Sequence, residues 1–103
     1  MQENIELSRK IKVEFKSLAA KNQVTMKDWL LNEAKDIIDN NEVVHRTERE
    51  DDRDSLIIKV PDDLKIRIKN YCEQEDVRIR DFWVECVNRL LVRYNDGWTI
   101  WGI

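Results

Sequence analysis

The sequence is poor in glycine, proline, cysteine and histidine, and each shortage argues against a class of fold or binding site. Two glycines and one proline leave little room for the many turns of an all-β domain or for a glycine-rich phosphate-binding loop. Two cysteines and one histidine form neither a disulfide framework nor a cluster with metal-ligand spacing. We therefore expect no metal, no cofactor and two reduced thiols in a cytoplasmic chain.

Long hydrophobic runs are missing too, since none approaches the 18 residues of a membrane span, and the N-terminus lacks a signal-peptide core. With 103 residues and an apolar share of 42%, the chain is expected to form one compact domain. The single histidine, His45, lies in a charged segment, and the carboxylates recur at salt-bridge spacing on helix faces. We expect no enzymatic activity.

Residues 55–94 carry the clearest pattern. The β-branched run LIIKV predicts a strand that stops at Pro61, and two aspartates after the proline suit the first turn of a helix. Apolar residues at helical spacing follow, and Glu75-Asp76 separates them from a second helix. A lone strand needs a partner strand.

A shift of 53 positions supplies that partner, because residues 1–38 then align with residues 54–91 without a gap. The apolar pattern agrees at nearly every core position, although identities are few: Ile5, Lys12, Lys16, Val24 and Asp28. The repeat predicts a strand over residues 2–7 and a helix from about Ser8 to Asn22. A second helix should begin near Thr25, whose hydroxyl can cap it, and end around residues 39–41.

Strand, helix and helix, with LIIKVP ending the strand and VRIRDFW opening the second helix, resembles the ribbon-helix-helix family of Arc/MetJ-type DNA-binding proteins. The resemblance implies two strands paired as an antiparallel ribbon that enters the major groove above four core helices. Here it implies a mainly α chain in which two fused halves share the ribbon. The single pseudo-dimeric domain, 1–103, would comprise a first half 2–39, an acidic linker 40–54, a second half 55–94 and a Trp-rich tail 95–103.

The resemblance also implies which residues meet DNA. Outward residues of the ribbon would contact bases: Gln2, Asn4, Ser55, Ile57 and Lys59. Glu6 departs from this pattern, because a carboxylate repels phosphate. The starts of the two second helices would hold phosphates through Thr25, Lys27, Arg78 and Arg80. Basic residues are unfavourable at a helix N-terminus, so the two arginines point to an anionic partner.

The net charge of −3 lies entirely in the linker. Residues 40–54 carry three basic and six acidic side chains, whereas residues 1–39 carry seven of each and residues 55–103 carry eight of each. Specific DNA contacts are compatible with such neutral lobes, but strong non-specific attraction is not expected. The linker itself is expected to be solvated, with an acidic flap near the DNA as the alternative.

The tail is unusually apolar, with Trp98, Ile100, Trp101 and Ile103 in six positions after Gly97. Gly97 is expected to end the last helix. An exposed tail of this kind would be adhesive. It either folds back, with Trp29 or Phe82 as candidate neighbours, or docks on a protein partner through Trp98 and Trp101.

The implied function is sequence-specific binding of double-stranded DNA, as a transcriptional repressor or as an accessory factor of plasmid, phage or mobile-element DNA. The alternative is a protein-interaction module that kept the fold and lost DNA binding. A second arrangement also stays open at this point. Two chains would pair their 56–60 strands into a true dimer, which leaves the first repeat to another role. Separately, further self-association of pseudo-dimers also stays open.

Overall fold

The computed structural model describes residues 2–44 and 53–99, with side chains as far as residue 94. The described elements are β1 (Gln2–Ser8), α1 (Arg9–Lys21), α2 (Met26–Asp39), β2 (Arg53–Lys59), α3 (Asp62–Glu75) and α4 (Ile79–Thr99). Strand, helix and helix therefore occur twice along the chain. The prediction of a mainly helical chain with one two-stranded antiparallel sheet is confirmed.

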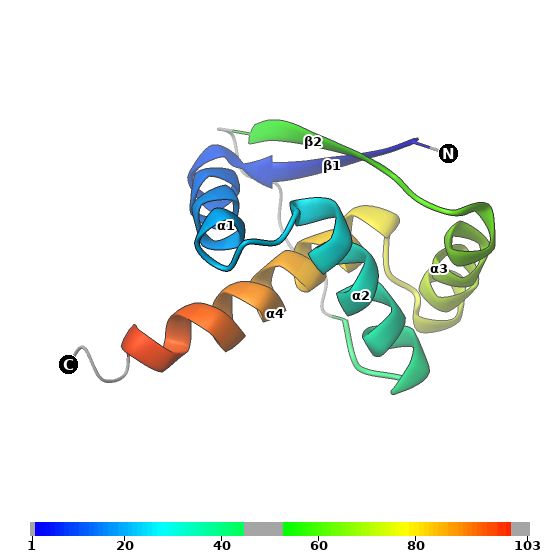
Figure 1. Ribbon diagram of the computed structural model, residues 1–103. Helices are drawn as coiled ribbons and strands as arrows, with labels where there is room; N and C mark the ends of the chain where they lie inside the picture. The colour runs from blue at the N-terminus through cyan, green and yellow to red at the C-terminus, as the bar shows by residue number, and fades with distance from the viewer. Residues whose placement is uncertain (1, 45–52, 100–103) are drawn as a thin grey trace.

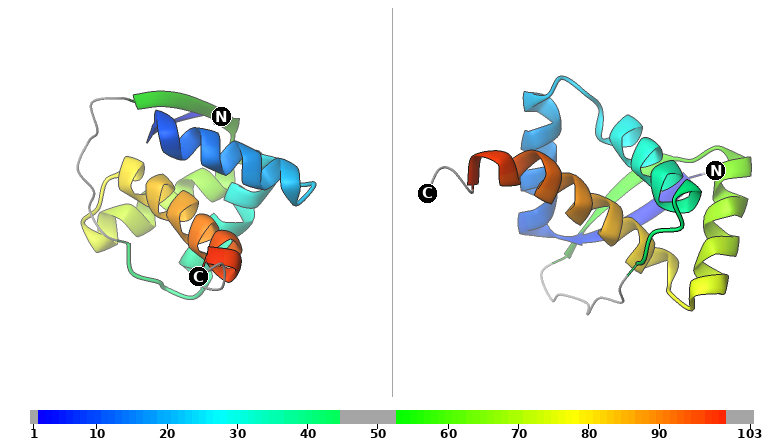
Figure 2. Two further views of the ribbon diagram at one scale, coloured as in Figure 1. Left: turned by 90° about the vertical axis from the view of Figure 1, so that its left-hand side faces the viewer. Right: turned by 90° about the horizontal axis from the view of Figure 1, so that it is seen from below.

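β1 pairs with β2 of the same chain in antiparallel orientation, from Gln2 opposite Lys59 to Ser8 opposite Arg53. Figure 1 shows this ribbon along one side of the molecule and the four described helices on the other. The left view of Figure 2 shows the same separation from the side. The first strand therefore finds its partner in cis, and the described ladder needs no second chain.

Side-chain caps explain where the first two helices begin. The Ser8 hydroxyl accepts a hydrogen bond from the backbone N–H of Ile11 at 3.1 Å, and the Thr25 hydroxyl accepts one from Asp28 at 3.0 Å. α3 begins directly after Pro61, with Asp62 and Asp63 in its first turn, as expected from the sequence.

The two helix–helix turns have the same construction. Gln23 and Asp76, which are 53 positions apart, both adopt a left-handed backbone, with φ of 57° and 56°. The next residue in each turn donates its backbone N–H back to the preceding helix, from Val24 to Ala19 at 3.1 Å and from Val77 to Cys72 at 3.0 Å. The repeat seen in the sequence thus extends to the hydrogen bonds of its turns.

Burial follows the same 53-residue spacing. Each buried residue of β1, α1 and α2 has a buried counterpart 53 positions later. These residues are Ile5, Leu7, Phe15, Leu18, Ala19, Trp29, Leu30, Glu33, Ala34 and Ile37. One core cluster joins the two sets beneath the ribbon.

Two predicted boundaries were wrong. α4 continues through Gly97 to Thr99, because glycine inside a helix costs only about 1 kcal/mol and stops the helix only when the chain needs a left-handed turn there. β2 begins at Arg53, three residues before the predicted strand LIIKV, which starts at Leu56. The expectations for the side chain of Trp98 and for residues 100–103, including Trp101, lie outside what the structure describes.

The beginning of the linker is attached to the helices, contrary to the expectation of a solvated segment. Val44 is buried, and the Tyr71 hydroxyl donates a hydrogen bond to the Glu42 carbonyl. Arg89 of α4 also binds the Glu42 carboxylate at 3.0 Å. Residues 45–52, with His45 and the idea of an acidic flap, lie outside the described part of the chain.

The aromatic side chains suggested as neighbours of the tail have partners within the fold. Trp29 stacks on Tyr94 of α4 with ring centroids 4.7 Å apart. Phe82 is fully buried and meets Tyr71 and Trp83 edge to face. Phe82 therefore offers no surface on which a tail or another protein could dock.

Candidate nucleic-acid interface

The ribbon has one side packed on the helices and one side turned away from them. Ile5, Leu7, Leu56 and Ile58 are buried on the packed side. Because strand side chains alternate, their neighbours lie on the opposite side, which we call the outer face. It comprises Gln2, Asn4, Glu6 and Ser8 of β1 with Arg53, Ser55, Ile57 and Lys59 of β2.

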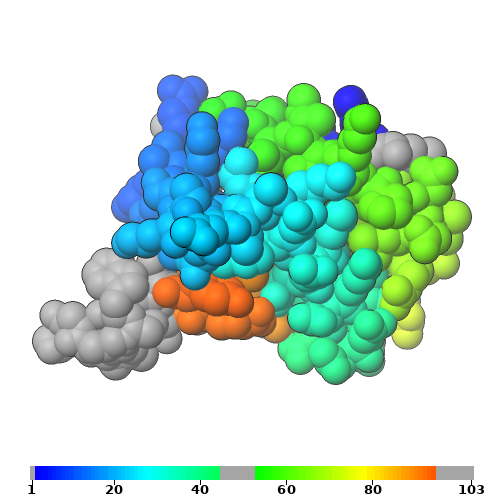
Figure 3. All heavy atoms as spheres, in the orientation of Figure 1, coloured from blue at the N-terminus to red at the C-terminus, as the bar shows by residue number. Residues whose placement is uncertain are grey.

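The structure brings together the five residues that the resemblance assigned to base contacts. Gln2, Asn4, Ser55, Ile57 and Lys59 are all exposed on the outer face, and the Ile57 side chain is 61% exposed. In the space-filling view of Figure 3, green atoms of the second strand lie along the upper edge of the molecule between blue atoms of the N-terminal residues. A two-stranded ribbon fits the major groove of B-DNA, which is about 12 Å wide.

The register of the ladder determines which of these side chains are neighbours. Gln2 pairs with Lys59 at one end, Asn4 with Ile57 in the middle and Glu6 with Ser55 towards the other end. Amide, hydroxyl and ammonium groups therefore stand in a row around one exposed apolar side chain. Such a row offers the donors and the methyl contact that distinguish base pairs in the major groove.

Arg53 belongs to the outer face but was missed in the sequence. Its Nη1 lies 3.5 Å from Oε2 of Glu6, so the carboxylate that departed from the family pattern faces a guanidinium. A signal was available, because the alternation of β2 continued back by two residues from Ser55 reaches Arg53. The linker's high charge density obscured the start of the strand.

One lysine from the first helix of each repeat holds an end of the ribbon. Lys12 Nζ lies 3.3 Å from the Asp54 carboxylate and donates to the Ser55 carbonyl at 2.7 Å. Its counterpart Lys65 lies 3.1 Å from the Glu3 carboxylate of β1. Hydrogen bonds from the Ser55 backbone N–H and from Lys12 lower the pKa of Asp54. Each lysine thus ties the opposite repeat's strand to its own helix.

The start of α4 contains a carboxylate of the chain itself. Asp81 is fully buried, and it accepts hydrogen bonds from the Arg78 backbone N–H at 3.1 Å and from Arg78 Nε at 2.9 Å. Arg80 Nη2 lies 3.7 Å from the same carboxylate. The hydrogen bonds to Asp81 raise the pKa of Arg78.

This arrangement supplies an anion for both arginines without a ligand, so their position at a helix N-terminus no longer requires an external partner. A carboxylate near the positive end of the helix dipole is favourable. Sequence reasoning sought the anion outside the chain because it treated Asp81 as one more surface acid.

The start of α2 differs from that of α4. Thr25 caps the helix, and Lys27 and Asp28 are both exposed, although Asp28 is the counterpart of the buried Asp81. Thr25 and Lys27 therefore lie together at an accessible helix start. Phosphate contacts are easier to make here than at the start of α4.

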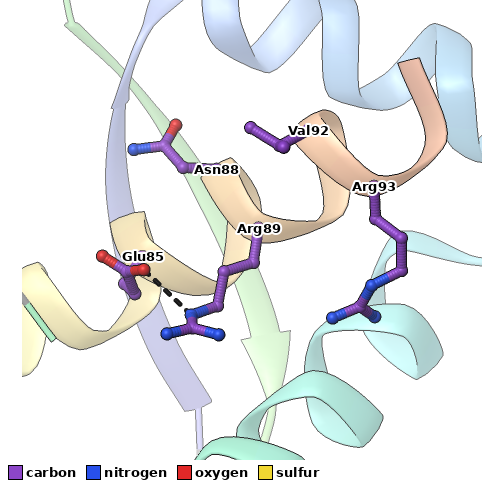
Figure 4. A pocket seen from close by; sticks show the side chains of 5 residues that line it. All are labelled: Glu85, Asn88, Arg89, Val92 and Arg93. Carbon is purple, nitrogen blue, oxygen red and sulfur yellow. Dashed lines mark hydrogen bonds and ion pairs between the residues drawn. The ribbon is translucent and has the colours of Figure 1, made fainter. Parts of the chain in front are cut away.

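A shallow hollow on α4 is a weaker candidate site. Figure 4 shows the five side chains that line it, Glu85, Asn88, Arg89, Val92 and Arg93. Its charges are engaged within the chain, since Arg89 binds Glu85 at 2.9 Å and Arg93 binds Glu33 of α2 at 2.8 Å. The two arginines that line the hollow therefore serve ion pairs within the protein, which makes the hollow a weaker binding site than the ribbon.

Comparison with family models, curated proteins and solved structures finds no match to this chain. Among residues 2–44 and 53–99, no helix is long and apolar enough to cross a bilayer. Over the same residues, no group of histidine, cysteine and acidic side chains is arranged to hold a metal ion. The function is therefore argued from the geometry of the ribbon.

Proposed function

We propose that this protein binds double-stranded DNA at specific sequences by inserting the β1–β2 ribbon into the major groove. In this proposal the chain is one domain made of two ribbon-helix-helix halves, residues 2–39 and 55–94, which share the ribbon as a pseudo-dimer. The repeated order of elements, the equal turns and the 53-residue spacing of the buried residues support this architecture.

The outer face is the observation that carries the proposal. A two-stranded ribbon is marginal by itself, and here it is stabilised from one side only. The other side presents hydrogen-bonding groups. Lys59 suits the guanine acceptors, Gln2 and Asn4 suit adenine, and Ile57 suits a thymine methyl. Ser55 completes the row as a donor or acceptor.

Phosphate binding is assigned first to Thr25 and Lys27, because their helix start is accessible. Arg78 and Arg80 would contribute only by sharing their contacts with Asp81. Such a protein would act as a transcriptional repressor or as an accessory factor of plasmid, phage or mobile-element DNA. Its neutral lobes imply few phosphate contacts and hence a shallow dependence of affinity on salt.

The test is fluorescence anisotropy with random and selected duplex pools at two salt concentrations. Lys59→Gln should weaken binding to the selected duplex by about 1–3 kcal/mol and relax the base preference at one position. Lys35→Gln is the matched control, since it removes an exposed charge on α2, away from the ribbon. It should leave the base preference unchanged. Absence of binding at low salt, or equal effects of both variants, would refute the proposal.

A protein-interaction module is the second candidate. It is favoured by Ile57, an exposed apolar side chain at the centre of the ribbon, and by the internal pairing of Arg78 with Asp81. Under this alternative, Lys59→Gln changes no DNA affinity because there is none. Removing residues 98–103, with Trp98 and Trp101, would then abolish capture of a partner by the tail while the fold is retained.

A further inference from the structure

The two ends of the outer face are not equivalent. The repeat relates Gln2 to Ser55, Asn4 to Ile57 and Glu6 to Lys59, because each pair is separated by 53 positions. In the ladder, Asn4 is paired with Ile57, its own counterpart. A two-fold axis that relates the repeats would therefore pass through this pair. Rotation about the axis would exchange the Gln2–Lys59 pair at one end with the Ser55–Glu6 pair at the other.

Charge differs between these ends. At one end Lys59 stands beside Gln2, which places an exposed ammonium next to an amide. At the other end the equivalent place is taken by Glu6, which pairs with Ser55 in the ladder and lies 3.5 Å from the Arg53 guanidinium. One end is thus a cation with an amide, and the other is a carboxylate with a guanidinium.

The chemistry of direct readout gives the two ends different preferences. Lysine donates to guanine O6 or N7, and glutamine makes two hydrogen bonds with adenine. A carboxylate accepts from cytosine N4, and arginine makes two hydrogen bonds with guanine. The Lys59 end therefore suits purine acceptors on one strand, whereas the Glu6–Arg53 end suits a C·G pair.

The middle of the ribbon is also directional. Asn4 suits an adenine edge and Ile57 suits a thymine methyl, yet they occupy the two places that a symmetric ribbon would fill with one residue type. The starts of α2 and α4 also differ between the halves. Asp81 is buried beside Arg78, while its counterpart Asp28 is exposed. Nothing along the outer face restores equality between the two ends.

We propose that the ribbon recognises a non-palindromic duplex site and binds it in one orientation, with the C·G pair under Glu6 and Arg53. The inference rests on the proposed DNA binding and adds the asymmetry of the target. Palindromic operators reflect proteins that present two identical halves. A ribbon with three non-equivalent outward pairs has no reason to prefer such a site.

The decisive experiment symmetrises the ribbon. The triple variant Glu6→Lys, Ser55→Gln, Ile57→Asn makes the two residues of each of the three outward counterpart pairs identical, whereas Arg53 has no counterpart in the repeat and is left unchanged. Selection from a random duplex pool should give a non-palindromic motif with the natural chain and a palindrome with the variant. The natural chain should prefer its motif over a palindrome built from either half by about five- to one-hundredfold, and the variant should reverse that order.

In the triple variant, Glu6→Lys places an ammonium beside Arg53, so the folding of this variant must be checked by thermal unfolding. A single substitution provides a second readout that avoids this problem. Glu6→Gln keeps the shape of the side chain and removes its charge. It should relax selection at one position on one side of the motif. Relaxation at two symmetry-related positions, or a palindrome selected by the natural chain, would overturn this inference and leave the proposed function standing. No selected motif at all would overturn both.

Discussion

The ion pair between Glu33 and Arg93 joins α2 to α4 and gives a sharp test of the packing. Glu33 is a charged residue in the core, with 3% of its surface exposed. Both its carboxylate oxygens accept hydrogen bonds from Arg93, at 2.8 and 3.1 Å. Figure 4 shows Arg93 reaching from α4 towards α2. These hydrogen bonds raise the pKa of Arg93.

Arg93→Met should destabilise the protein by about 2 kcal/mol. Losing one partner of a fully buried pair costs about 3–5 kcal/mol, because the remaining charge stays buried. Arg93 itself is 49% exposed, so water can replace part of its contribution, and the lower figure follows. For a domain of about 100 residues, this loss corresponds to a fall of about 10 °C in Tm.

Thermal unfolding followed by circular dichroism measures this, with two further variants for comparison. Arg67→Met is the matched control, since Arg67 pairs with Asp39 on the surface and both side chains are well exposed. It should cost about 0.5 kcal/mol or less. The double variant Glu33→Met, Arg93→Met should recover most of the loss by removing the buried charge. Equal effects of Arg93→Met and Arg67→Met, or a double variant no more stable than the single, would refute the reasoning.

Three other predictions concern the core. Phe15→Ala removes a side chain with no exposed surface and should lower the free energy of unfolding in urea by about 3–5 kcal/mol. A cost below about 1 kcal/mol would contradict the described packing. Burial raises the pKa of Cys72 to about 11 and that of Cys86 well above its usual value. Both thiols should therefore resist Ellman's reagent at pH 8 until the chain is unfolded. Unfolded thiols ionise near pH 9, so stability should fall as the pH rises from about 9 to 11, and a pH-independent stability there would contradict the assignment.

Periodicity predicted the parts of the fold that depend on the core. Each helix buries one face and each strand buries alternate residues, so positions such as Phe15 and Ile68 carry a signal that survives in a single sequence. Helix starts were also predictable, because Thr25 and Pro61 act through local hydrogen bonds and fixed backbone angles.

Features that depend on tertiary partners were not predictable in this way. Gly97 lies inside α4 although glycine commonly ends helices. Asp81 is one acid among many in the sequence, and only the fold buries it beside two arginines. In the sequence Arg53 belongs to the charged linker, but in the structure it pairs with Ser8 of β1 and lies close to the Glu6 carboxylate. For Asp81 the deciding feature is its burial, and for Arg53 it is a strand partner distant in sequence.

Three identities between the two halves lie at structural positions, and none lies on the outward side of the ribbon. Among the five identities between the halves, Ile5 and Ile58 are buried, Val24 and Val77 make the same turn hydrogen bond, and Lys12 and Lys65 each tie down the opposite strand. None of the three outward pairs on the ribbon is an identity. These three identities serve the core, the turns and the ends of the ribbon, whereas the residues that would read DNA differ between the halves in all three outward pairs. Recognition of an asymmetric site requires outward residues that differ between the halves, and the fold allows this because only its structural positions need to be similar.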